Sequence, residues 1–147
     1  MYQRILIATD RSRLSRKAEK AAIGLAASLG ATLVVLHVVP DYPTSYFEGA
    51  VTLTPQEIAR IESQWTAQGQ STVDAVVAAA GRLGVQAKGV LAHSDKVAEA
   101  VMASARKHKC DLIVMASHGR RGITRVLLGS ETQHVLTHST IPVLVLR

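Results

Sequence analysis

The sequence contains one cysteine, few aromatic side chains and no long hydrophobic run. The single cysteine, Cys110, cannot form a disulfide within the chain, which fits a reducing cytoplasm. No run of about 18 apolar residues is present, so no membrane span is predicted. The first ten residues enter an apolar segment directly, without the regions of a signal peptide. We therefore expect a cytoplasmic protein, with Cys110 as a small buried residue rather than a reactive thiol.

Several common catalytic and nucleotide motifs are also missing. No G-x-x-x-x-G-K-[ST] segment occurs and no G-x-G-x-x-G follows the first apolar segment, which argues against a Walker-type ATPase or a dinucleotide dehydrogenase. The nucleophile elbow G-x-S-x-G is absent as well. Ser117 and His118 are sequence neighbours, so we do not expect them to face each other as a catalytic pair. No catalytic set is predicted, and any hydrolysis or self-phosphorylation should be slow.

Two histidines and the tryptophan receive structural interpretations. His134 and His138 lie four residues apart and could share a metal ion, but H-E-x-x-H needs a glutamate where Val135 stands. We interpret both as surface histidines. Trp65 and its apolar companions are interpreted as core residues.

The 147 residues are enough for one domain, and apolar segments alternate with segments of helical period. The predicted strands are residues 4–10, 31–39, 85–92, 111–117 and 141–147. One helix is predicted over residues 14–29, ending at Gly30, and a second runs from a capping box at Thr54 and Glu57 to Leu83, with a bend near Gly69. Ser94 is predicted to cap a third helix, and Ser130 to start a fourth.

The strands are apolar with little alternation, which is typical of strands covered on both faces. With right-handed crossovers, the pattern predicts a single-domain α/β fold: an open, doubly wound, five-stranded parallel sheet with helices on both faces, similar to a Rossmann fold. Residues 40–53 form the one conspicuous loop. It is compatible with a cover for a site and with a simple connector.

Ligands of such sheets bind beyond the carboxyl ends of the strands, where the strand order reverses. The first predicted strand ends in ATDRS, and the fourth leads into MASHGRRGITRVLLGS. Glycines before a helix leave N–H groups and the positive end of the macrodipole for an anion. Asp10 could accept hydrogen bonds from ribose hydroxyls, or could be a helix cap or a solvated strand end. Ser130 with Gln133 also fits a simple capping box.

The segments ILIATDRS, VVLHVV, DLIVMASHGRRGITRVLLGS and STIPVLVLR together resemble a universal stress protein of the UspA superfamily, nearly from end to end. The most specific resemblance is the family's nucleotide motif: glycine, two residues, glycine, nine residues, glycine, then serine or threonine. Gly119, Gly129 and Ser130 match it, whereas Ala116 stands at the first glycine. Arg11 also stands where many members have glycine. The extra methyl group of Ala116 is tolerated if its φ stays negative.

The resemblance implies the ATP-binding branch of the family, a regulatory stress-response protein holding ATP with Mg²⁺ or Mn²⁺. A nucleotide-free, dimeric interaction protein of the same fold is the alternative. The resemblance places adenosine at three residues near the first strand, adenine at a backbone group of the second, and phosphates at the fourth strand and helix. These predicted contacts are Thr9, Asp10, Ser12, Val38, Ala116, His118, Gly119, Gly129, Ser130 and Thr132.

The formal net charge is +6, and basic residues follow the first and fourth predicted strands. Both clusters are expected to flank the phosphate site and to raise the local anion concentration, although a solvated helix face explains the first cluster equally well. Nucleic-acid binding ranks below nucleotide binding, because aromatic residues are few and no recognised module occurs. The clusters are Arg11, Arg13, Arg16, Lys17 and Lys20, and Arg120, Arg121 and Arg125.

The last predicted strand, IPVLVLR, is apolar on both alternating faces. A strand at the edge of a sheet would expose unpaired backbone groups, and pairing with the same strand of a second copy would satisfy them. The family resemblance implies such a dimer too. We therefore predict a homodimer formed through this strand.

Overall fold

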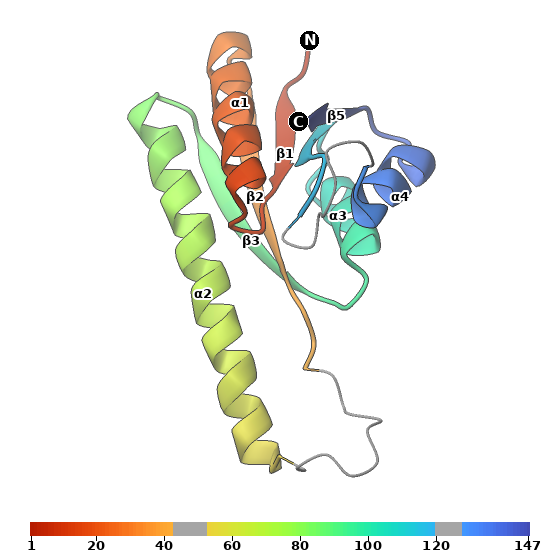
Figure 1. Cartoon of the computed structure of the whole chain (residues 1–147). Helices are drawn as coiled ribbons and strands as arrows, with labels where there is room; N and C mark the ends of the chain where they lie inside the picture. Colours follow the sequence, from red (N-terminus) through yellow and green to blue (C-terminus); the bar gives the residue numbers. More distant parts are fainter. Residues whose placement is uncertain (43–52, 120–127) are drawn as a thin grey trace.

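The computed structural model describes residues 1–42, 53–119 and 128–147, and these form a five-stranded sheet with four helices (Figure 1). The sheet has the order β3-β2-β1-β4-β5, and every pair of neighbouring strands is parallel. The predicted fold class is confirmed. In chain order the elements are β1 Arg4–Ala8, α1 Arg13–Leu29, β2 Thr32–Val39, α2 Pro55–Arg82, β3 Ala87–His93, α3 Val97–Lys107, β4 Leu112–Ala116, α4 Ser130–His138 and β5 Val143–Leu146.

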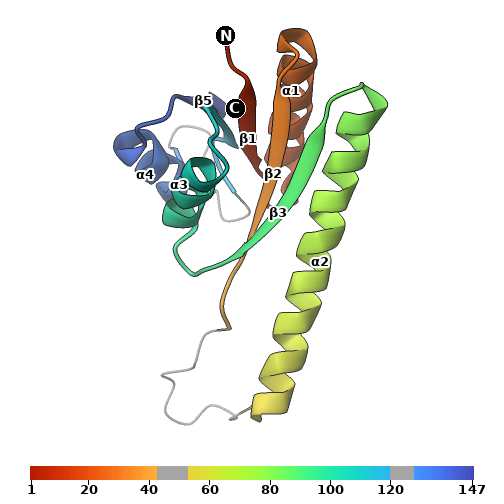
Figure 2. The same ribbon diagram turned by 180° about the vertical axis from the view of Figure 1, so that it is seen from behind.

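The helices form one layer on each side of the sheet (Figures 1 and 2). Ile5 and Ile7 of β1 pack in the core beneath α1 and α2, while Leu6 between them packs toward α3 and α4. All three side chains are fully buried. Side chains of a strand alternate between the two faces, so the unbroken apolar run in β1 supplies both cores.

The order of the strands reverses between β1 and β4, as expected for the ligand site of a doubly wound sheet. These strands are neighbours in the sheet, with Ile5 opposite Leu112 and Ile7 opposite Val114. The chain moves outward from β1 to β2 and β3 on one side, and from β4 to β5 on the other. The carboxyl ends of β1 and β4 therefore meet at one end of the molecule.

The helix α2 is one continuous helix of 28 residues that includes Gly69, where a bend was predicted, and its ribbon runs without a break (Figure 1). Gly69 serves close packing instead, because a Cβ there would lie 2.7 Å from Cδ2 of His37 in β2. The predicted capping box is present. The Thr54 hydroxyl accepts from the Glu57 amide at 3.2 Å, and the Glu57 carboxylate accepts from the Thr54 amide at 2.6 Å.

The helix α4 begins at Ser130, as predicted, whereas the predicted cap of α3 was wrong. The helix α3 begins at Val97, with Lys96 as its N-cap residue, and Ser94 accepts a hydrogen bond only from the Lys96 amide. The helix α4 has Gly129 as its N-cap, so Ser130 is already helical and the predicted box with Gln133 is not formed. The first turn of α3 is capped by Glu131 of α4, whose carboxylate accepts from the Ala98 amide at 2.7 Å.

Cys110 is 6% exposed and lies between α3 and β4, as predicted for a small buried residue. Burial raises the pKa of its thiol to about 11. In the described part of the chain, no helix is both long and apolar enough to cross a membrane.

Candidate functional site

A cavity of about 780 Å³ opens at the carboxyl ends of β1, β2 and β4. Its size is in the range of small-molecule sites. Its walls come from the ends of these three strands, from α2, from the turn before α3 and from the start of α4. Nine of the ten predicted contacts line it: Thr9, Asp10, Val38, Ala116, His118, Gly119, Gly129, Ser130 and Thr132. The tenth, Ser12, does not.

The first turn of α4 is fastened to the end of β4 by two hydrogen bonds. The Thr132 hydroxyl donates to the Ala116 carbonyl at 2.9 Å, and the Gly129 amide donates to the Ser117 carbonyl at 2.7 Å. A Cβ on Gly129 would lie 3.2 Å from that Ser117 oxygen, although the φ of Gly129 is an ordinary −58°. Glycine is therefore needed at 129 for space rather than for a left-handed backbone.

The amide groups that open α4 are directed by helix geometry toward the cavity end of the helix. The first N–H groups of a helix have no acceptor within it, and within the described chain no side chain caps those of α4. Ser130, Glu131 and Thr132 all line the cavity. Their N–H groups and the positive end of the helix dipole form the part of the site that suits an anion.

At the end of β1, Asp10 lies beside the glycine segment that follows β4. The carboxylate of Asp10 accepts from the Ser12 amide at 2.9 Å. A Cβ on Gly119 would lie 2.6 Å from the other carboxylate oxygen of Asp10. The two parts of the chain that the sequence predicted to converge, residues 9–10 and 116–119, do converge. Ser12 is instead the N-cap of α1, and its hydroxyl accepts from the Ser15 amide at 3.1 Å.

The sequence departs from the expected family pattern at Arg11 and Ala116. The backbone conformation explains the expectation of glycine at position 11 and is compatible with alanine at position 116. Arg11 has a φ of +68°, a left-handed conformation that glycine adopts at little cost. This is the position where the resemblance to the universal stress proteins led us to expect glycine. Ala116 is not among the residues of positive φ, so the condition set for tolerating its methyl group is met.

The end of β2 offers unpaired backbone groups to the cavity. The Leu36 carbonyl accepts from the Thr9 amide at 2.9 Å, so the polar groups of Leu36 point toward β1. In a parallel ladder the same direction recurs two residues later, at Val38. The pairing of β1 with β2 ends at Leu36, and the structure shows no bond from the Val38 backbone to any described residue on that side. The backbone N–H and C=O groups of Val38 therefore suit hydrogen bonds to the edge of a planar ring in a ligand.

His118 carries an unsatisfied polar atom beside the cavity. Its Nδ1 shares a hydrogen bond of 2.9 Å with the Ser117 hydroxyl, whereas its Nε2 is buried and has no partner in the described structure. The expectation that these two side chains would not face each other was wrong. The chain leaves β4 after Ala116, so the alternation of side chains in a strand no longer separates them. Ser117 is nevertheless only 2% exposed.

The charge of the described lining differs from the prediction. Three carboxylates line the cavity, and Arg11 is the one basic side chain among the lining residues that the structure describes. The other members of the first basic cluster are exposed on α1 and do not line it, which is compatible with a solvated helix face. Arg120, Arg121 and Arg125 lie outside the described residues. The three carboxylates are Asp10, Asp95 and Glu131.

Sequence reasoning missed the wall that α2 provides. Trp65 is not a core residue: it lines the cavity and stacks on Tyr42, with ring centroids 5.9 Å apart. Gln68 and His37 line the cavity too, and the His37 ring donates from Nδ1 to the Thr9 carbonyl at 2.9 Å. The apolar stripe of α2 gave the right face of the helix. It did not show that this end of the helix extends past the core to the cavity.

Thr9 is held from beneath the cavity by a buried network. It is 5% exposed, and its hydroxyl bonds to the Ser15 hydroxyl at 3.2 Å and donates to the Glu19 carboxylate. Burial raises the pKa of the Glu19 carboxyl; the hydrogen bond from Thr9 and the charge of Arg16 act in the opposite direction, and Asp10 adds to the increase. The outcome is a Glu19 pKa above its ordinary value.

The two late histidines are exposed on α4, with ring centroids 4.3 Å apart. The His138 ring donates from Nδ1 to the His134 carbonyl at 3.0 Å. Among the residues described, no group of three or more histidine, cysteine, aspartate or glutamate side chains is arranged to hold a metal ion.

The fold and site define a doubly wound α/β protein with a cavity at its topological switch point, where proteins of this class bind ligands. The chain belongs to the universal stress protein family, because the model of that family matches residues 1–147. It is 32% identical to the universal stress protein YxiE of Bacillus subtilis, with all of both chains covered. The structure of the universal stress protein UspA from Lactobacillus plantarum has the same fold, with a TM-score of 0.84 at 24% identity over 99% of this chain and 98% of that one.

Some structures of this fold contain adenine nucleotides. A universal stress protein solved in complex with cAMP has a TM-score of 0.71 at 24% identity, over 99% of this chain and 97% of that one. A universal stress protein from Archaeoglobus fulgidus is a complex with dAMP, with a TM-score of 0.68 at 18% identity over 99% and 98% of the two chains. At these identities the likeness establishes the fold. The two ligands share an adenine base, a sugar and a phosphate.

Proposed function

We propose that this protein binds ATP, with Mg²⁺ or Mn²⁺, in the cleft between β1 and β4, and that the bound nucleotide acts as a regulatory signal in a stress response. The observation that carries the proposal is the convergence of nine predicted contacts on one cavity, from β2, β4, α4 and the segments that follow β1 and β4 and precede α4. The adenine nucleotides in structures of the same fold support the class of ligand.

Each part of the nucleotide has a suitable partner in this arrangement. The carboxylate of Asp10 would accept hydrogen bonds from ribose hydroxyls, and the backbone of Val38 would meet the adenine edge. The amides at the start of α4 would hold phosphate oxygens, and His118 Nε2 would gain the partner that it lacks. Gly119 and Gly129 leave the space that a Cβ would fill.

A divalent ion would be held mainly by the phosphates. Mg²⁺ keeps several water ligands and needs only one or two carboxylates when phosphates supply the rest. Asp10 lies near enough to the glycine segment to contribute, and the ion would offset the negative charge of the lining. When bound, the ion neutralises phosphate charge.

We expect slow turnover at most. A serine and histidine are hydrogen-bonded at the cavity wall, but Ser117 is almost completely buried and its oxygen is not available as a nucleophile. Bound ATP would therefore persist long enough to act as a signal.

The alternative is a nucleotide-free interaction protein of the same fold. Two observations favour it: the described lining carries three carboxylates, and the Gly129 amide already donates to the Ser117 carbonyl. In that case the glycines serve only the close approach of α4 to β4.

One experiment separates the two functions. The purified protein is denatured and its supernatant analysed for adenine nucleotide, and ATP with Mg²⁺ is then titrated by calorimetry. ATP binding in the parent, abolished by Gly129→Val, supports the proposal. Gly81→Val is the matched control, because no atom lies within 4 Å of a Cβ at that position of α2. Absence of binding in the parent, or unchanged binding in Gly129→Val, would overturn it.

We also propose that the protein is a cytoplasmic homodimer that pairs through β5. This strand lies at the edge of the sheet, and Leu144 is 40% exposed on it. Pairing with a second copy would satisfy its free backbone edge and cover this apolar surface. Light scattering at micromolar concentration should give twice the mass of the chain. A monomeric mass would contradict the proposal.

A further inference from the structure

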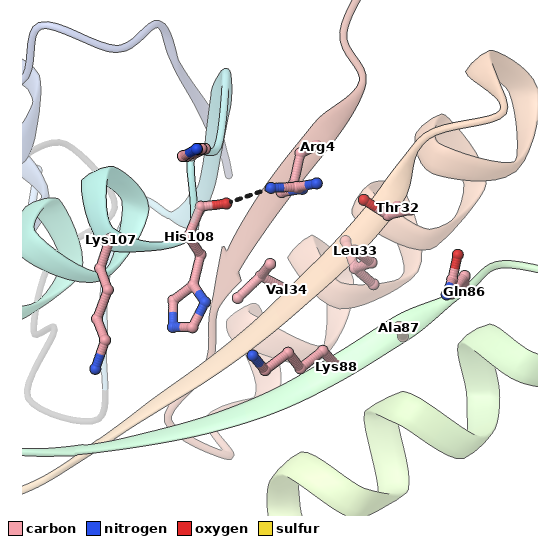
Figure 3. A pocket seen from close by; sticks show the side chains of 10 residues that line it. Arg4, Thr32, Leu33, Val34, Gln86, Ala87, Lys88, Lys107 and His108 are labelled. Atoms are coloured by element: carbon pink, nitrogen blue, oxygen red, sulfur yellow. Dashed lines mark hydrogen bonds between the residues drawn. The ribbon is translucent and has the colours of Figure 1, made fainter.

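A second cavity, of about 510 Å³, lies at the opposite end of the sheet (Figure 3). It lies beside the C-terminus of α3 and the starts of β1, β2 and β3. Arg4 begins β1 and Thr9 follows its end, so the two cavities are separated by roughly 16 Å of extended strand. Among the described residues, five basic or titratable side chains line this cavity and no carboxylate does. The five are Arg4, Lys88, Lys107, His108 and Lys109.

The cations come from distant parts of the chain and meet around one imidazole. Figure 3 shows the His108 ring between the ends of Lys107, from α3, and Lys88, from β3. Burial lowers the pKa of His108 most, and the positive charges of Lys88, Lys107 and Arg4 lower it further. Three elements, β1, β3 and α3, thus bring positive charge to the same cavity.

Arg4 is fixed in place by hydrogen bonds to the segment between α3 and β4. The Arg4 guanidinium donates from Nη1 to the His108 carbonyl at 2.9 Å. The Arg4 and Gln3 amides both donate to the Asp111 carboxylate, at 3.0 and 2.8 Å. These bonds tie the start of β1 to the segment between α3 and β4. They leave the other donors of the Arg4 guanidinium unused.

Within the described chain no carboxylate forms an ion pair with the cations of this cavity, and the Asp111 carboxylate accepts instead from the Gln3 and Arg4 backbone amides. The one ion pair formed between described residues is Lys96 with Glu99, elsewhere on the surface. The carbonyl end of α3 carries only about half a negative charge, which is smaller than the charge of four cations. Basic residues at a helix C-terminus explain Lys107, but they do not explain Lys88 and Arg4, which lie on strands.

We propose that this cavity is a binding site for a small, multiply charged phosphate anion, such as an inorganic di- or triphosphate group. Separate cations grouped around a pocket suit several anionic oxygens at once. The volume is that of a small-molecule site rather than of a long groove. Among the described lining residues there is no tryptophan, tyrosine or phenylalanine, so the cavity lacks the large aromatic platforms typical of nucleobase binding.

The experiment uses the full chain and inorganic tripolyphosphate, titrated by calorimetry at low salt without metal. The Lys88→Gln/Lys107→Gln variant should weaken binding at least about tenfold. The control, Lys17→Gln/Lys20→Gln, changes the net charge equally on α1, away from the cavity, and should weaken it less than about twofold. Gly129→Val should bind as the parent does, because the adenine-nucleotide cleft is separate. If the protein fails to bind ATP, the tripolyphosphate titration still tests this cavity by itself.

A second measurement locates the anion. His108 is followed by NMR, with its resonance assigned from His108→Asn. Bound anion should move the pKa of His108 upward, because it offsets the charges of Lys88, Lys107 and Arg4. An unmoved His108, or equal losses in both double variants, would overturn the proposal. So would tighter binding of a DNA duplex that the pocket variant alone abolishes, because the surface would then serve nucleic acid.

Discussion

A Cβ atom on Gly119 would lie 2.6 Å from a carboxylate oxygen of Asp10. The two residues are 109 positions apart in the sequence, and the pairing of β1 with β4 brings them together. The glycine segment after β4 and the acidic residue after β1 therefore form one surface. Any side chain at 119 has to move the carboxylate that is proposed to hold the ribose.

The first prediction tests this contact with Gly119→Ala. The new methyl group should displace the Asp10 carboxylate and weaken ATP binding by about tenfold, as expected for loss of one charge-assisted hydrogen bond. Stability should change little, because the displaced atom ends a side chain. The matched control is Gly24→Ala in α1, where a Cβ meets nothing within 4 Å. It should leave binding unchanged and raise stability by about 0.5–1 kcal/mol. If calorimetry gives the same ATP affinity for Gly119→Ala and for the parent, the proposed role of Asp10 is contradicted.

The second prediction uses Trp65, the one tryptophan of the chain. A ligand that fills the cleft should displace water from the indole, so ATP should change its fluorescence with the same midpoint as the calorimetric titration. The change should disappear in Gly129→Val. Calorimetric binding without any fluorescence change would place the ligand away from the α2 wall.

The architecture could be predicted because its signals are local. Uninterrupted apolar runs such as Leu33–Leu36 indicate strands covered on both faces, and parallel strands with right-handed crossovers leave few topologies. The site followed from the same reasoning, because the switch point of the sheet fixes which strand ends meet. Family resemblance added the individual residues.

The details that failed depend on partners distant in sequence. Ser12 caps α1, whereas Ser94 does not cap α3. The amide of Ala98 in the first turn of α3 donates instead to Glu131 of a neighbouring helix. A sequence pattern records the residue type but not this competing partner. Similarly, Arg4 and Lys88 lie far apart along the chain, and only the sheet brings them together. The basic cavity therefore left no signal in the sequence.

The third prediction concerns the strained turn at Arg11, whose φ is +68°. Arg11→Gly should raise the free energy of unfolding by about 0.5–1 kcal/mol, because the left-handed strain of an L-residue exceeds the entropy cost of glycine there. The control is Arg16→Gly, at an exposed position inside α1, which should lower it by about 1 kcal/mol. Urea denaturation measures both. A destabilised Arg11→Gly would show that the arginine side chain makes a stabilising contact.

The fourth prediction concerns Cys110, which is buried and has a thiol pKa raised to about 11. At pH 8 almost none of it is thiolate, the form that reacts. An aromatic disulfide reagent should therefore modify the folded protein slowly, and should modify one thiol rapidly after unfolding in urea. Rapid labelling of the folded protein would mean that the junction between α3 and β4 opens readily.

The last prediction follows from Glu19, whose pKa is raised mainly by burial. Because the folded-state pKa lies above the ordinary value of 4.5, the unfolded state releases this proton first as the pH rises. The stability contributed by Glu19 is therefore complete below about pH 4.5 and is lost as the pH rises through the folded-state pKa. Glu19→Gln keeps an acceptor for Thr9 but cannot ionise.

Its melting temperature should match that of the parent at pH 4 and exceed it by a few degrees at pH 7.5. The control, Glu62→Gln, makes the same charge change at an exposed position of α2. The difference between its melting temperature and that of the parent should not grow as the pH rises. Glu19→Gln also tests whether the network around Thr9 affects ATP binding in the cleft. Glu19 accepts a hydrogen bond from Thr9, and Thr9 lines the cleft. If the difference in melting temperature between Glu19→Gln and the parent stays constant from pH 4 to 7.5, the burial of this carboxyl does not control its ionisation.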